Sequence, residues 1–129
     1  MRYDPMRSPI CGEWTALDEG EQIAFVSDYH RRSRIKVPNL RVHAAMHVAV
    51  ENQVLMGDAT PVADALERLT AEGLDRHEAI HAVASVLAGL MFDSIKSQGG
   101  DDLKGGYYRD VSKLTADTWL SQADDGAGP

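Results

Sequence analysis

The chain has 129 residues, which is enough for one globular domain with a buried hydrophobic core. Its content of 43% hydrophobic and 26% charged residues excludes a largely disordered protein. The net charge of −7 argues against broad electrostatic binding to nucleic acids, so duplex DNA or RNA is not expected as a partner.

The opening segment, residues 1–14, is predicted to be irregular because prolines and a glycine interrupt it. It carries charges where a secretion signal needs an apolar stretch. The single cysteine, Cys11, allows no intramolecular disulfide, which favours a reducing compartment. The most apolar stretch, residues 79–92, is interrupted by His81 and Ser85 and is too short to cross a bilayer. We therefore expect a cytoplasmic protein without a membrane span.

A first helix is predicted to begin after Asp18 and to end near Ser33. Asp18 and Glu21 have the spacing of a capping box. Pro38 forces an extended backbone soon after the helix ends. Four basic residues lie in the last turn of this helix or just after it: Arg31, Arg32, Arg34 and Lys36. This basic cluster is interpreted as cations at the negative end of the helix dipole, with a phosphate or nucleic-acid contact as the alternative.

Three further main helices are predicted from start and stop signals. They cover residues 40–56 after Asn39, residues 61–72 after Thr60, and residues 76–97 after Asp75. Gly57 and Gly73 are predicted to end the first two of these helices. The third is apolar over much of its circumference and should lie centrally in the core.

The C-terminal part is predicted to contain only short helical pieces. Glycines frame a loop over residues 99–106, a short helix follows over 107–114, and Thr115 caps one more turn to Trp119. Residues 121–129 are expected to be a frayed tail. The sequence therefore predicts one all-α domain, a compact antiparallel bundle of about four main helices plus a short C-terminal helical segment.

All five histidines are predicted to lie at one end of this bundle. Short connections place sequential helices antiparallel, so the helices 40–56 and 76–97 should run in the same direction. The histidines are His43 and His47 near the start of one helix, His77 and His81 near the start of the other, and His30 near the end of the first helix.

The spacing of these histidines indicates a metal site. His43 and His47 are four residues apart and share a helix face, and Glu51 continues the same row. Neutral imidazoles with a nearby carboxylate suit a divalent transition metal such as zinc or iron. The predicted ligand set is His43, His47, His77, His81 and Glu51.

The same histidines have a non-catalytic interpretation. Buried imidazoles can bond to one another, to Glu51 or to helix-end backbone groups. In that case the chain is an interaction or structural module, and the histidines form a hydrogen-bond network that fixes the fold. His30 is expected to be a helix-end residue rather than a ligand. The sequence leaves open whether the protein is an enzyme and whether it forms a homo-oligomer.

Glu78 also has two interpretations. The run from His77 to His81 matches the H-E-x-x-H pattern of zinc peptidases, in which the glutamate is the general base. Those enzymes need a third ligand downstream, and no histidine follows His81. Because Asp75 and Glu78 also form a capping-box pattern, we expect Glu78 to cap its helix rather than to act in catalysis.

Two stretches and the opening Tyr3-Asp4-Pro5 resemble a family of short bacterial proteins known only as a domain of unknown function. The stretches are PNLRVHAAMHVAVENQ at residues 38–53 and GLDRHEAIHA at residues 73–82. The resemblance covers residues 3 to about 96 and implies a fold, without an activity, cofactor or partner.

Two broader similarities concern the histidine spacing. His47-x-x-x-Glu51 and His77-x-x-x-His81 resemble ligand pairs of hemerythrin-type di-iron bundles. The chain lacks the later histidine and aspartate of those proteins, which argues against a di-iron centre. The arrangement on two helices is also similar to the three-histidine metal bundles of the damage-inducible thiol-transferase-like group.

Overall fold

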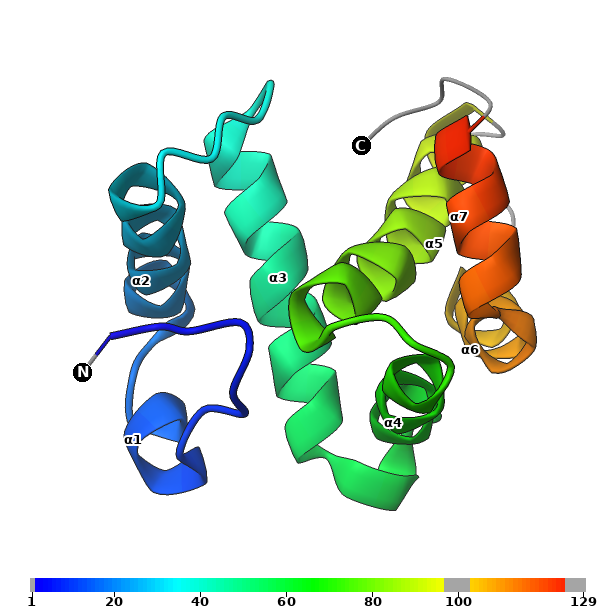
Figure 1. Cartoon of the computed structure of the whole chain (residues 1–129). Coiled ribbons are helices and arrows are strands. Elements are labelled where there is room, and N and C mark those ends of the chain that lie inside the picture. The colour runs from blue at the N-terminus through cyan, green and yellow to red at the C-terminus, as the bar shows by residue number, and fades with distance from the viewer. Residues whose placement is uncertain (1, 97–102, 125–129) are drawn as a thin grey trace.

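A computed structural model describes residues 2–96 and 103–124, and within these ranges the protein is all-α, as predicted, without a strand (Figure 1). A 3-10 turn, Gly57–Ala59, lies between α3 and α4. The helices are α1 (Cys11–Thr15), α2 (Glu19–Arg32), α3 (Leu40–Leu55), α4 (Val62–Ala71), α5 (Arg76–Lys96), α6 (Leu103–Lys113) and α7 (Ala116–Asp124).

The main helices begin where the capping residues predict. The Asp18 carboxylate accepts a hydrogen bond from the Glu21 N–H at 2.8 Å, and the Glu21 side chain accepts one from the Asp18 N–H at 3.1 Å. The Asn39 side chain accepts from the N–H of Val42 at 3.2 Å at the start of α3. These bonds satisfy N–H groups that have no partner inside the helix, which explains why α2 and α3 start at these residues.

The chain turns after α3 and α4 at the predicted glycines. Gly57 has a φ of 59° and Gly73 a φ of 113°, in the left-handed region that favours glycine. Arg31 and Arg32 of the basic cluster lie in the last turn of α2, where cations stabilise a helix C-terminus.

Three short segments differ from the prediction. Residues 11–15 form α1 instead of irregular chain, and its Trp14 is completely buried. The helix expected from Tyr107 begins at Leu103, because burial of Tyr107 and Val111 outweighs the low helix propensity of the preceding glycines. The end of α7 extends into the predicted tail, to Asp124. The predicted loop glycines 99 and 100 and the last five residues lie outside the described ranges.

Two hydrophobic clusters meet along α3. One packs the opening segment, α1 and α2 against α3, and it contains Tyr3, Trp14, Val26, Ala44 and Val48. The other packs α4 to α7 against the opposite side of α3, and its completely buried residues include Val50, Leu69, Ile80, Val83 and Val111. Figure 1 shows α1 and α2 on one side of α3 and the later helices on the other. The histidines lie between these two clusters.

The predicted common direction of the second and fourth main helices is wrong. Arg76 at the start of α5 pairs with Glu51 of α3, whereas His81, further along α5, lies beside the earlier His43. The contacts therefore run in opposite senses along α3 and α5, and Figure 1 shows α5 beginning beside the middle of α3 and running away from it. The short turn at Gly57–Ala59 sends α4 across α3, since a short connection fixes how near two helix ends lie but not the angle between the helices.

Among the described residues, α5 is the one helix long and apolar enough to cross a membrane by length and composition. The window is Arg76–Ile95, with a mean hydropathy of 1.4, so it is longer than the stretch considered from the sequence. This is weak evidence for a span, because a core helix of a soluble protein has the same properties. Residues 79–84 of α5 contribute mostly buried side chains, whereas Met91, Phe92 and Ile95 are exposed. The prediction that this helix lies centrally in the core therefore holds only for its first half. The absence of a membrane span stays a prediction.

Candidate metal centre

All five histidines gather where α2, α3 and the start of α5 meet, so the predicted clustering is confirmed. The predicted location at one end of a bundle is wrong, because α5 begins beside the middle of α3 (Figure 1). α2 contributes His30, α3 contributes His43 and His47, and α5 contributes His77 and His81. Centroids of neighbouring imidazole rings lie between 4.3 and 5.7 Å apart. Each helix with two histidines carries them one turn apart, so both rings of a pair project from the same helix face.

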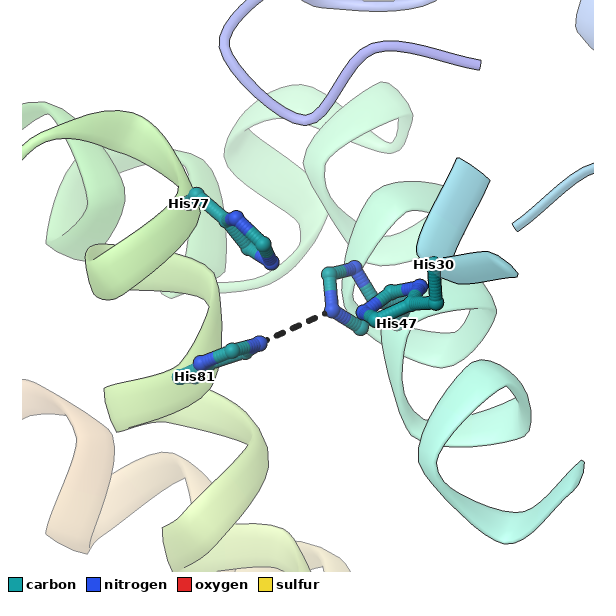
Figure 2. Close-up of side chains that lie close together, drawn as sticks. All are labelled: His30, His47, His77 and His81. Atoms are coloured by element: carbon teal, nitrogen blue, oxygen red, sulfur yellow. Dashed lines mark hydrogen bonds between the residues drawn. The ribbon is translucent and has the colours of Figure 1, made fainter. Parts of the chain in front are cut away.

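Four of these histidines can offer one nitrogen each to a common ion. The nitrogens of His30, His47, His77 and His81 all lie within 4.8 Å of one another. Figure 2 shows His77 and His81 on one side, facing His30 and His47 on the other. The Nε2 atoms of His47 and His81 are 3.0 Å apart. A tetrahedral zinc ion with bonds of about 2.0–2.1 Å holds its nitrogens about 3.3 Å apart, so small ring movements would bring this group to metal geometry.

Hydrogen bonds on the Nδ1 side of the His47 ring determine which of its two nitrogens carries the proton. The Tyr3 hydroxyl donates to the Glu51 carboxylate at 2.6 Å, and the same oxygen lies 3.1 Å from His47 Nδ1. Because the phenol has a single hydrogen and gives it to Glu51, His47 Nδ1 must donate to the phenol oxygen. The other nitrogen, Nε2, then keeps its lone pair and points at the cluster.

His30 is held in the same tautomer by the backbone. Its Nδ1 lies 2.9 Å from the Val26 carbonyl oxygen, which can only accept a hydrogen bond. The proton is therefore on Nδ1, and the lone pair is on Nε2. Within the described part of the chain, the buried Nε2 atoms of His30, His43 and His77 have no hydrogen-bond partner. Buried polar atoms are nearly always satisfied, so three unsatisfied nitrogens in one cluster indicate a place for a ligand.

Burial keeps these imidazoles neutral, which is the form that binds metals. Loss of solvation lowers the pKa of His43 to about 4, with a smaller effect from His30 and His77. It lowers the pKa of His81 to about 3, helped by His77 and His43. Burial lowers the pKa of the other three histidines as well. At neutral pH the cluster therefore presents lone pairs rather than cations.

A buried ion pair between Arg76 and Glu51 holds the carboxylate to which Tyr3 donates its hydrogen bond. Arg76 donates to both oxygens of Glu51, at 2.6 and 2.8 Å, and the Glu51 side chain has no solvent exposure. Arg76 also donates to the Pro5 carbonyl at 2.9 Å, so it ties the opening segment to α3 and α5. The Glu51 charge is thereby neutralised, and its carboxylate orients Tyr3.

Glu78 takes no part in this ion pair and makes two contacts of its own. Its N–H donates to the Asp75 carboxylate at 2.8 Å, so the predicted Asp75 cap at the start of α5 is present. The Glu78 side chain, which was expected to cap the helix too, bonds to α7 instead. The Glu78 carboxylate accepts a hydrogen bond from the Trp119 indole N–H at 2.5 Å. This contact attaches α7 to α5.

Comparison with known protein families gave a match to this chain. A family model described as Domain of unknown function (DUF1841) matches residues 12–112. The chain belongs to this family. No curated protein and no solved structure gave a match. The DUF1841 match confirms the resemblance seen in the sequence, and it includes every histidine together with Glu51 and Arg76, whereas Tyr3 and Trp119 lie outside the matched residues.

The four nitrogens that converge in the structure do not all come from the predicted ligands. His47, His77 and His81 come together as predicted, but the fourth nitrogen in the group is that of His30. The ring of His43 packs against this group, with its centroid 4.8 Å from that of His81, but His43 is not among the four residues whose nitrogens converge. The predicted ligand Glu51 does not face the cluster, because its carboxylate accepts the hydrogen bond of the Tyr3 hydroxyl.

His30 lies in the last turn of α2, as predicted, but it is completely buried and offers a nitrogen to the cluster. The available signal was its position one turn after Val26 on the buried stripe of α2. Tyr3 and Arg76 were missed as well, because their contacts join segments far apart in the chain.

Proposed function

We propose that the protein binds one divalent transition-metal ion through His30, His47, His77 and His81. One observation carries the proposal: four imidazole nitrogens within 4.8 Å of one another, from three helices, in a buried site. The tautomers of His30 and His47 support it, because each directs a lone pair rather than an N–H into the cluster.

Zinc or iron(II) suits this donor set best. The ligands are neutral imidazoles without a carboxylate or a water-rich shell, and such sites favour zinc, iron, copper or nickel over magnesium or calcium. In this proposal Glu51 orients His47 through Tyr3 and is not a ligand, since both its oxygens are used by Arg76 and Tyr3. Glu78 has a structural role at the contact with α7.

The competing function is the non-catalytic module with a histidine hydrogen-bond network. The contact between the Nε2 atoms of His47 and His81, at 3.0 Å, supports it, because a neutral pair can share one proton there. The network leaves three buried nitrogens without a partner among the described residues, which is why we favour the metal site. A cytoplasmic location, expected from the single cysteine, remains part of the proposal.

Cobalt(II) titration of metal-free, tag-free protein tests the ligand set. Visible absorption should saturate at one equivalent, since cobalt(II) in a nitrogen site absorbs where the aqueous ion barely does. His30→Ala should weaken binding by at least about tenfold, whereas Glu78→Gln should bind as the wild type does. Circular dichroism shows whether each variant is folded. Folded wild-type protein that never develops the absorption, or His30→Ala with unchanged affinity, would contradict the proposed site.

A further inference from the structure

A pocket opens beside the histidine cluster, in addition to the four-nitrogen site itself. Its volume is about 360 Å³, within the range of small-molecule sites. His43, His47 and His81 form its inner end. The walls come from α3, α5, α7 and the segment before α3, and they are mostly apolar: Pro38, Val42, Met46, Ala84, Ala88 and Trp119. Asn39, Ser85 and Gln122 add polar groups to the lining. The pocket therefore leads from the surface to two of the proposed ligands, His47 and His81, and to His43.

A divalent ion in the proposed metal site would carry positive charge that no residue lining the pocket balances. None of its lining residues, all of them described, is an aspartate, glutamate, lysine or arginine. The proposed ligands are neutral imidazoles, so they leave the two positive charges of the ion uncompensated. The buried carboxylate of Glu51 is paired with Arg76, and Asp4, Asp75 and Glu78 act on His77 from outside the pocket. A ligand that reaches the ion from the pocket is therefore favoured if it carries a negative charge.

We propose that the pocket binds a small apolar monocarboxylate, with its carboxylate as a fifth ligand to the ion held by the four histidines and its hydrocarbon body against the apolar part of the walls. This inference rests on the proposed metal site. Met46 and Trp119 supply adaptable and flat apolar surface for the body of the ligand. His43, which also lines the pocket, is not one of the four proposed ligands, so its imidazole adds a polar group at the inner end.

Octanoate is a suitable probe, with octan-1-ol and acetate as matched comparators that lack the carboxylate and the hydrocarbon chain respectively. Calorimetric titrations use cobalt-loaded and metal-free protein. Octanoate should bind the loaded protein at least about tenfold more tightly than either comparator, and at least about tenfold more tightly than it binds the metal-free protein. It should also change the visible cobalt spectrum.

Ala88→Phe separates the pocket from the metal site. Ala88 lines the pocket and is not a proposed ligand, so the phenyl ring should fill part of the pocket while cobalt still binds. Octanoate affinity should fall by at least about tenfold, and Ala24→Phe, at an exposed position of α2, should leave it unchanged.

The outcomes distinguish the two proposals. Protein that binds cobalt but binds octanoate no better than octanol or acetate would overturn the monocarboxylate inference alone. So would equal octanoate binding with and without metal, or an unchanged octanoate affinity in folded, cobalt-loaded Ala88→Phe. Folded protein that binds no cobalt would overturn the metal site and this inference together.

Discussion

Proton positions on single imidazoles decide whether the cluster attracts or repels a cation. His47 gives its Nδ1 proton to Tyr3, which in turn donates to Glu51. The carboxylate is held by Arg76, so four groups in series keep one lone pair directed at the site. Such outer hydrogen bonds orient metal-binding histidines and raise their basicity.

Tyr3→Phe tests this chain of contacts. The phenyl ring keeps the packing against Trp14, but His47 loses the acceptor for its Nδ1 proton. Metal affinity should fall by about ten- to a hundredfold, measured by titration of metal-free protein. Tyr107→Phe is the matched control, because Tyr107 is equally buried and its hydroxyl bonds to Gln53, in the hydrophobic cluster around α4 to α7. Equal affinities in both variants would show that Tyr3 does not orient His47.

At the scale of elements, helix starts were predictable and helix crossings were not. Asp18, Asn39 and Asp75 each make the capping bond that their sequence pattern indicates, because capping depends on residues only two or three apart. The directions of α3 and α5 depend on how α4 packs across α3, which no local pattern specifies. The cluster of histidines was nevertheless predicted, since the crossing brings the start of α5 against the first half of α3.

The site residues also divide into those that a local sequence pattern predicts and those that depend on long-range packing. His47, His77 and His81 could be predicted because helical spacing puts each pair on one face. The inward position of His30 follows from packing between α2 and α3. The partner of Glu78 is Trp119, which lies on a helix that the sequence predicted as a single turn. Contacts of this kind join residues far apart in the chain and have no local signature.

The cap of α5 gives a prediction about stability. Asp75→Ala removes the acceptor for the Glu78 N–H, so the free energy of unfolding should fall by about 1 kcal/mol. Glu78→Gln keeps an oxygen that can accept from the Trp119 indole, so the free energy of unfolding should be nearly unchanged. Urea denaturation of both variants makes the comparison. A larger loss in Glu78→Gln than in Asp75→Ala would mean that the Glu78 charge, and not the cap, stabilises this helix.

For the whole molecule, the location of five neutral histidines between two hydrophobic clusters makes stability depend on pH. The pKa values of His43 and His81 fall to about 4 and about 3 in the folded protein, below the ordinary value of 6.5. The unfolded chain therefore binds more protons in this range, and protons favour unfolding. The stabilisation is fully present above about pH 6.5 and is lost as the pH falls toward 3–4.

Urea denaturation in the presence of a chelator measures this effect. The free energy of unfolding should decrease steadily between pH 7 and pH 5 in metal-free protein. His43→Gln should weaken the dependence, because glutamine does not titrate, and an exposed substitution such as Ala24→Gln should not. A free energy of unfolding that is constant or rises as the pH falls through this range would show that the histidines are not buried in the neutral form.

Metal content of the whole protein tests the central claim most directly. Protein purified without a histidine tag, and without chelator, is subjected to elemental analysis and then to the same analysis after incubation with zinc and dialysis. The four-histidine site predicts one zinc or iron ion per chain in at least the incubated sample, and its loss from His47→Ala. Folded protein without stoichiometric metal in either sample would contradict the metal site and leave the histidines as a hydrogen-bond network.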